Sequence, residues 1–134
     1  ESATPSAPIE EAILELKLEA NDRKMLETLF MVGAPESKHR LSERTQTQIA
    51  RALVNAFVAL ASTNPTLLLV EDLQYVDPES RHFLQLLARE KTAQPLCILL
   101  TCRPESSKMA TAMADLVIRL QPLSQTTGCQ HHQS

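Results

Sequence analysis

A short apolar stretch that ends in two carboxylates constrains the folding of this 134-residue chain more than any other feature. Residues 66–70 (Thr-Leu-Leu-Leu-Val) carry no charge, and Glu71 and Asp72 follow them directly. A continuous apolar run of this length, without alternation of polar residues, is typical of a parallel strand buried on both faces. We expect strand alternation to send Glu71 and Asp72 to opposite sides of the strand end. Open α/β sheets bind their ligands at such carboxyl ends, so the two acids are the first candidates for a site.

The composition indicates a globular chain of one domain, since 43% of its residues are hydrophobic. A net charge of −3 gives no electrostatic reason to expect direct contact with nucleic acid or with an anionic membrane. No apolar run approaches the ~20 residues of a membrane span, and no signal-peptide pattern is present. The cysteines (Cys97, Cys102 and Cys129) are odd in number and lack metal-ligand spacing, which favours reduced thiols. We therefore expect a cytoplasmic protein.

Hydrophobic periodicity predicts helices between polar segments at both ends of the sequence. Residues 1–8 are expected to be a linker, residues 9–124 the folded domain and residues 125–134 a disordered polar tail. Helical patterns begin at residues 9, 21, 43, 78 and 105. Ser42 and Asp77 are the expected N-caps of the third and fourth helices. The third helix has a broad apolar stripe, which is typical of a helix packed against a sheet.

A second apolar run, residues 96–101, ends at Thr101 and is followed by Cys102 and Arg103. A helix between two buried strands predicts a right-handed crossover and a parallel strand pair. That pairing would bring Thr101 and Arg103 to the same sheet edge as Glu71 and Asp72. Residues 116–120 are a third, shorter strand candidate. The fold class expected from these patterns is α/β, with about three mostly parallel strands and flanking helices.

Carboxylates and a guanidinium at one sheet edge are suited to binding a metal–phosphate group. Acids there can hold a hydrated Mg²⁺ or polarise a water molecule, and an arginine can contact a phosphate oxygen. A solvated salt bridge at the edge of the sheet is an equally simple interpretation. A third interpretation is an enzyme that uses Glu71 and Asp72 as an acid/base pair. Adjacent acids on a strand point apart, which argues against this third interpretation.

Three motifs in order carry a resemblance to the signal-transduction P-loop ATPases of the STAND and AAA type. Residues 67–78 (Leu-Leu-Leu-Val-Glu-Asp-Leu-Gln-Tyr-Val-Asp-Pro) resemble the Walker B stretch of that family. Residues 98–105 resemble the strand ending in Thr-x-Arg, where the family keeps its sensor arginine, and residues 118–124 are similar to the Leu-x-Pro-Leu-Ser that follows the next strand. The resemblance covers roughly residues 40–124. Such modules occur in bacterial transcriptional regulators and in proteins that carry nucleotide cyclase domains.

The resemblance implies a role for each matched residue. Glu71 would take the position of the acid that associates with Mg²⁺ through water. Asp72 would share that metal site and would orient or activate the attacking water. Arg103 would sense the γ-phosphate, and Thr101 would complete the nucleotide-binding set. Residues 9–124 would then form part of a three-layer P-loop NTPase core.

The sequence departs from the family in the part that binds phosphate. The loop Gly-x-x-x-x-Gly-Lys-Ser/Thr and its preceding strand are absent, and the only glycines are Gly33 and Gly128. Gln74 and Tyr75 replace the commoner His-Trp, which is a milder departure. The resemblance therefore implies half of an ATPase domain, whose parent would use Mg²⁺, ATP and the rest of its own chain.

We expect these 134 residues alone neither to bind ATP tightly nor to hydrolyse it. Whether the chain belongs to an enzyme stays open, since ATPase activity is expected only of an intact parent. The alternative is a non-catalytic α/β interaction module that keeps the NTPase scaffold without the chemistry. Sheet edges left open by the missing strand would favour self-association.

Overall fold

The computed structural model describes residues 11, 14–32, 42–90 and 93–124, which form a mixed α/β fold. The predicted linker (1–8), the predicted tail (125–134) and residues 9, 10, 12 and 13 of the first predicted helix lie outside the described residues. Residues 11, 14 and 15 of that helix are helical, but residues 16–19 are not, so the helix ends earlier than the sequence predicts. The elements run in the order α2 (Ala20–Val32), α3 (Glu43–Thr63), β1 (Thr66–Val70), α4 (Pro78–Arg89), β2 (Leu96–Leu100) and α5 (Ser107–Met113), with short 3₁₀ turns at Leu73–Tyr75 and Pro104–Ser106. In this described part, no helix is long and apolar enough to cross a membrane.

The predicted caps begin the two helices that flank β1. The Ser42 side chain accepts a hydrogen bond from the backbone N–H of Thr45 (3.3 Å) at the start of α3. The Asp77 carboxylate accepts one from the backbone N–H of Ser80 (2.9 Å) at the start of α4. Each bond satisfies a backbone donor that the first helical turn leaves without an intrahelical partner. Both N-cap predictions are confirmed.

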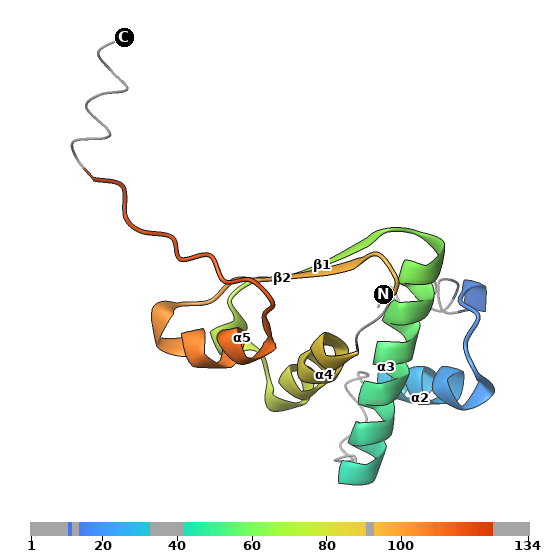
Figure 1. The fold of residues 1–134 in the computed structure, drawn as a ribbon. Helices are drawn as coiled ribbons and strands as arrows, with labels where there is room; N and C mark the ends of the chain where they lie inside the picture. The colour runs from blue at the N-terminus through green and yellow to red at the C-terminus, as the bar shows by residue number, and fades with distance from the viewer. Residues whose placement is uncertain (1–10, 12–13, 33–41, 91–92, 125–134) are drawn as a thin grey trace, which may run out of the picture.

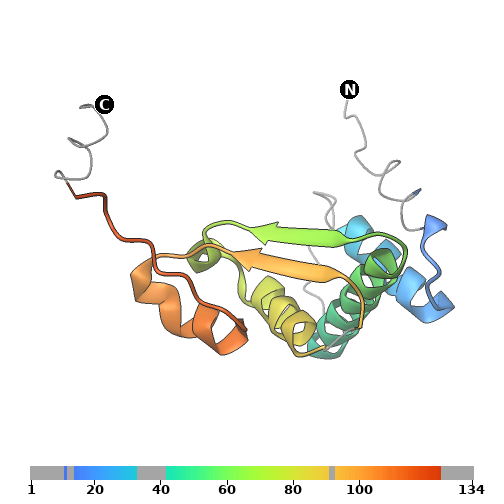
Figure 2. The same cartoon turned by 45° about the horizontal axis from the view of Figure 1, so that its top comes forward.

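The two strands form the parallel pair that the sequence predicts. Thr66 lies opposite Leu96, and the register continues without a slip to Val70 opposite Leu100. Helix α4 connects the strands, and Figures 1 and 2 show α3 and α4 on the same side of the sheet. The parallel arrangement places both carboxyl ends at one edge of the sheet.

The expectation that the strands are buried on both faces is wrong. Exposure alternates along β1 and β2, and Leu67, Leu69 and Leu99 expose 63%, 50% and 50% of their surface. The cause is that helices cover only one face, so the described chain has two layers where three were expected. An apolar side chain is buried only when another element packs on it, whatever the strand's composition.

The expectation of a third strand over residues 116–120 is also wrong. The described sheet has two strands only, and residues 116–120 pair with neither of them. Leu116 and Leu120 are 78% and 92% exposed. Figures 1 and 2 show this segment running away from the sheet beyond α5. Strand-type residues form a strand only where a partner supplies the hydrogen bonds, and here no neighbouring strand does so.

The core lies between the helices, with α3 at its centre. Leu26 of α2 and Ala52 of α3 are fully buried against each other, and four partly buried residues pack around them (Leu18, Met25, Leu53 and Ala56). On its other side α3 contacts α4, where the rings of Phe57 and Phe83 lie 5.6 Å apart. The broad apolar stripe predicted for this helix thus faces helices on two sides.

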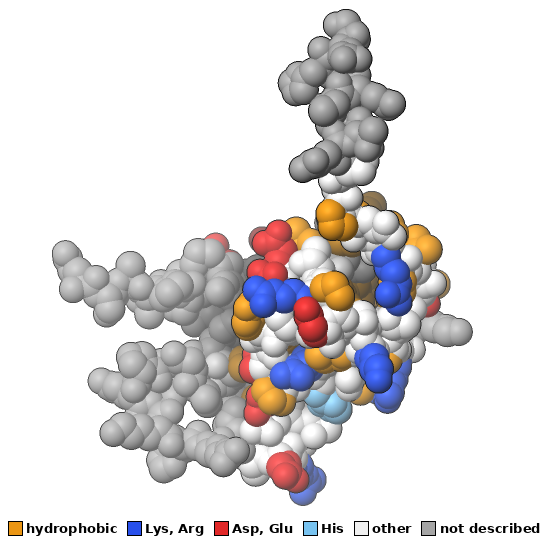
Figure 3. Space-filling view, turned by 90° about the vertical axis from the view of Figure 1, so that its left-hand side faces the viewer, with side chains coloured by type: hydrophobic (Ala, Val, Ile, Leu, Met, Phe, Trp, Pro, Cys, Tyr) orange, Lys and Arg blue, Asp and Glu red, His pale blue; other side chains and the backbone are white. Residues whose placement is uncertain are grey.

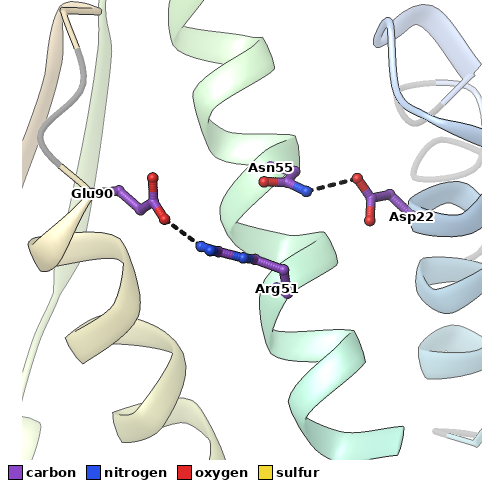
Figure 4. A network of polar contacts seen from close by, with 4 residues as sticks. All are labelled: Asp22, Arg51, Asn55 and Glu90. Carbon is purple, nitrogen blue, oxygen red and sulfur yellow. Dashed lines mark hydrogen bonds and ion pairs between the residues drawn. The ribbon is translucent and has the colours of Figure 1, made fainter.

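Polar contacts join the same three helices (Figure 4). The Asn55 side-chain amide on α3 donates a hydrogen bond of 2.7 Å to the Asp22 carboxylate on α2, and this contact is partly buried. Arg51 on α3 forms an exposed ion pair with Glu90 at the end of α4. The side chains of α3 therefore orient α2 and α4 relative to each other.

Candidate functional site at the carboxyl ends of the strands

The four residues predicted for the site lie at one edge of the sheet. Val70 and Leu100 are the last paired residues of β1 and β2, so Glu71 and Thr101 leave the sheet side by side. Asp72 and Arg103 follow within two residues, and the side chains of all four are exposed. Figure 3 views the molecule from the side on which the strands end, where acidic and basic side chains are interspersed with apolar ones.

Thr101 joins the two strand ends through three hydrogen bonds. Its backbone N–H donates to the Val70 carbonyl (2.9 Å), and its own carbonyl accepts from the N–H of Leu73 (2.8 Å). Its hydroxyl accepts from the N–H of Asp72 (3.0 Å). Thr101 therefore positions the backbone of Asp72. Its hydroxyl is used for this contact within the protein.

Asp72 has an unusual backbone conformation. Its φ of 55° and ψ of 55° place it in the left-handed region, and it is the only non-glycine residue with positive φ in the described part of the chain. This conformation costs an ordinary L-residue about 1–2 kcal/mol, although aspartate and asparagine adopt it more readily than most. Strained backbone of this kind is concentrated at functional sites.

Gln74 connects Asp72 to Arg103. Its side-chain Nε2 donates a hydrogen bond to Oδ1 of Asp72 (3.3 Å), and its Oε1 accepts one from the backbone N–H of Arg103 (3.2 Å). The guanidinium carbon of Arg103 lies 5.7 Å from the centre of the Tyr75 ring. A cation near an aromatic ring at this distance is attracted to the ring face.

Gln74 and Tyr75 also lie at this edge, although in the sequence they stand out only as departures from a family pattern. The signal that could have found them is their place in the turn immediately after the two acids. The chain must reverse there, so side chains two and three residues on return to the strand ends. A polar amide and an aromatic ring at those positions can contact whatever follows β2.

The solvated salt bridge of the alternative interpretation is not formed at this edge among the described residues. Within the described residues, neither Glu71 nor Asp72 makes an ion pair with Arg103. The arginine packs on Tyr75 instead. The carboxylates and the guanidinium therefore face solvent without neutralising each other, and each remains able to bind a ligand of opposite charge.

Two carboxylates, those of Glu71 and Asp72, lie at this edge. No group of three or more His, Cys, Asp or Glu side chains in the described part of the chain could hold a metal ion. Mg²⁺ keeps several waters and is usually bound by one or two carboxylates together with substrate phosphates. Two carboxylates are within the number that such a site uses.

The nearby Asp77 carboxylate has a structural role. Hydrogen bonds from the backbone N–H of Ser80 and then from the Ser80 hydroxyl (2.7 Å) hold its pKa below the ordinary value of 3.8. Both bonds stabilise the ionised form, and the positive end of the α4 dipole does the same. Asp77 therefore caps α4, and its charge is already satisfied within the protein.

Two cavities of the described chain lie away from the candidate edge. The larger, of about 470 Å³, is a shallow hollow at the opposite ends of the strands, lined by Pro65, Thr66, Leu67, Gln94, Pro95, Leu96 and Cys97. A smaller one of about 90 Å³ lies between α4 and α5. The side chains at the carboxyl ends of the strands are exposed, so a ligand bound there would need a further surface to enclose it.

Comparisons with family models, with curated proteins and with solved structures found no match for this chain.

Proposed function

We propose that this chain supplies the metal-binding and phosphate-sensing half of an ATP-hydrolysing regulatory domain. The observation that carries the proposal is the set of hydrogen bonds through which Thr101 and Gln74 hold Asp72 and Arg103 at one sheet edge. A carboxylate and a guanidinium that form no ion pair lie at the ends of adjacent parallel strands. These are the groups that an Mg²⁺–triphosphate requires. The resemblance to signal-transduction P-loop ATPases supports the same assignment.

The roles of the residues follow from their positions. Glu71 and Asp72 would hold Mg²⁺ through water, and Asp72 would also orient the attacking water. Arg103 would contact the γ-phosphate, and Tyr75 would restrict the guanidinium until phosphate is bound. Thr101 would keep Asp72 in its left-handed conformation. Bound Mg²⁺ would neutralise charge on the phosphate oxygens.

The proposal predicts weak binding by this chain alone, because no glycine-rich loop is present to cradle the phosphates. A nuclear magnetic resonance titration with ATP, with and without Mg²⁺, tests it. We expect millimolar, Mg²⁺-dependent shifts confined to the amides of residues 71–75 and 101–103. An absence of shifts there would contradict the site. Micromolar affinity by calorimetry would contradict the need for a separate phosphate-binding half.

A second candidate function is a non-catalytic interaction module on the same scaffold. The apolar outer face of the sheet, with Leu67, Leu69 and Leu99 half or more exposed, favours it. A module of this kind would bind a partner through that face and would show no Mg²⁺-dependent response at the strand ends. The same titration therefore separates the two functions.

A further inference from the structure

The outer face of the sheet presents an apolar patch that none of the described elements covers. Leu67 lies opposite Cys97 and Leu69 opposite Leu99 in the strand register, so these four side chains share one face. We call them the outer patch. Figures 1 and 2 show the described helices on the opposite side of the sheet. An exposed apolar face of this kind on a small sheet marks a surface that another element covers.

The same chain carries a strand-like segment without a sheet. Residues 116–120 (Leu-Val-Ile-Arg-Leu), which we call the free segment, are rich in residues that favour strands. Along a strand, Leu116, Ile118 and Leu120 would share one face, while Val117 and Arg119 would lie on the other. Leu116, Ile118 and Leu120 are at least 74% exposed, and Val117 is 45% exposed.

The sheet has open edges that could pair with such a segment. A sheet of two strands leaves one side of each strand without hydrogen-bond partners from the sheet, and β1 and β2 are the whole of the described sheet. A third strand with an apolar face would add stability to a sheet of two strands. The described chain therefore has a two-stranded sheet with open edges and a strand-like segment that pairs with no strand.

We propose that two copies of this chain dimerise by exchanging their free segments. Each free segment pairs with an open sheet edge of the other copy, and its apolar side joins the outer patch there. In each copy the outer patch and the added segment form one apolar face, and these two faces pack against each other. Val117 and Arg119 lie on the strand face away from this interface.

The apolar area available for burial limits the stability of the dimer. Three leucines of the outer patch and three apolar residues of the free segment are each 50–92% exposed in a single copy. Burying them in two copies would remove roughly 500–1,000 Å² of apolar surface from water. The main chain of the paired strands brings the total close to the ~1,200 Å² at which specific interfaces begin. We therefore expect a dimer that dissociates on dilution.

The dimer is independent of the proposed nucleotide site, because Asp72 and Arg103 take no part in it. Sedimentation velocity of the full chain over a range of concentrations measures it directly. We expect Ile118→Pro to weaken the dimer by at least about tenfold, because proline removes a ladder N–H. Leu69→Asp should do the same by placing a charge in the outer patch.

Leu123→Pro is the matched control, since Leu123 is 89% exposed but lies beyond the free segment. It should dimerise as the unaltered chain does. Far-ultraviolet circular dichroism should show equal helix content in the Ile118→Pro and control chains, because residue 118 lies outside the described helices.

Three results would overturn the exchange. One is a monomer at the highest concentration, including a monomer whose free segment is protected from hydrogen exchange by pairing within its own chain. Another is a dimer that Ile118→Pro leaves unchanged. The last is a dimer that Leu69→Asp leaves unchanged, because both the segment and the patch are required.

Discussion

The two faces of the β1–β2 sheet have similar residues but different surroundings. Leu68 and Ile98 point toward the helix layer and are partly buried, while Leu69 and Leu99, one position further along each strand, are half exposed. The residues are equally apolar, so the difference comes from the elements around them. In this chain the helices α2, α3 and α4 supply the packing, and the outer face of the sheet depends on whatever else covers it.

Replacing a leucine by alanine should lower the free energy of unfolding far more in the helix core than on the outer face of the sheet. Leu26→Ala in the helix core should lower the free energy of unfolding by about 2–5 kcal/mol, because it leaves a cavity beside Ala52. Leu69→Ala on the outer face should change it by less than about 0.5 kcal/mol in a dilute monomer. Urea denaturation measures both. Equal losses would show that the outer face is already buried.

Helix α3 makes one partly buried and one exposed polar contact, and the two should contribute differently to stability. Asn55→Ala should cost about 1–2 kcal/mol, because the partly buried Asp22 carboxylate loses its hydrogen-bond donor. Arg51→Ala should cost no more than about 1 kcal/mol, since its ion pair with Glu90 is exposed to water. Denaturation at low and high salt separates them: only the Arg51 effect should shrink with salt. A larger loss for Arg51→Ala would contradict this ranking.

The two helix caps provide a comparison that depends on pH. Asp77→Ala and Ser42→Ala should each cost about 1 kcal/mol at neutral pH. The pKa of Asp77 is lowered in the folded state, so its contribution is present above the ordinary value of 3.8 and is lost as the pH falls through the lower, folded-state value. The cost of Asp77→Ala should therefore disappear in acid, while that of Ser42→Ala should persist. Thermal unfolding from neutral to strongly acidic pH tests this, and parallel curves for the two variants would refute it.

Much of the fold could be predicted because its signals are local. The caps at Ser42 and Asp77 and the apolar runs that became β1 and β2 depend on neighbouring residues only. The parallel pairing followed from the helix between the strands. These features place Glu71, Asp72, Thr101 and Arg103 at one edge, as the sequence predicted.

The remaining features depend on partners that a local pattern does not show. The apolar character of Leu67 and Leu69 predicts that they are buried, yet no described element packs on them. Residues 116–120 read as a strand for the same reason, yet no strand pairs with them. The roles of Gln74 and Tyr75 arise from the sharp turn at Asp72, whose left-handed backbone conformation was not apparent from a carboxylate at a strand end.

The most direct test of the proposed function is to remove the charge of Asp72 while keeping its shape. Asp72→Asn should change stability by only a few tenths of a kcal/mol, because asparagine also tolerates the left-handed region and can accept the bond from Gln74. Glu27→Gln on α2 is the control for loss of one exposed carboxylate.

The measurement is the Mg²⁺-dependent shift of the Thr101 and Arg103 amides on titration with ATP. We predict that Asp72→Asn abolishes this shift and that Glu27→Gln leaves it unchanged. Equal shifts in the two variants would contradict an Mg²⁺–phosphate site at the carboxyl ends of the strands.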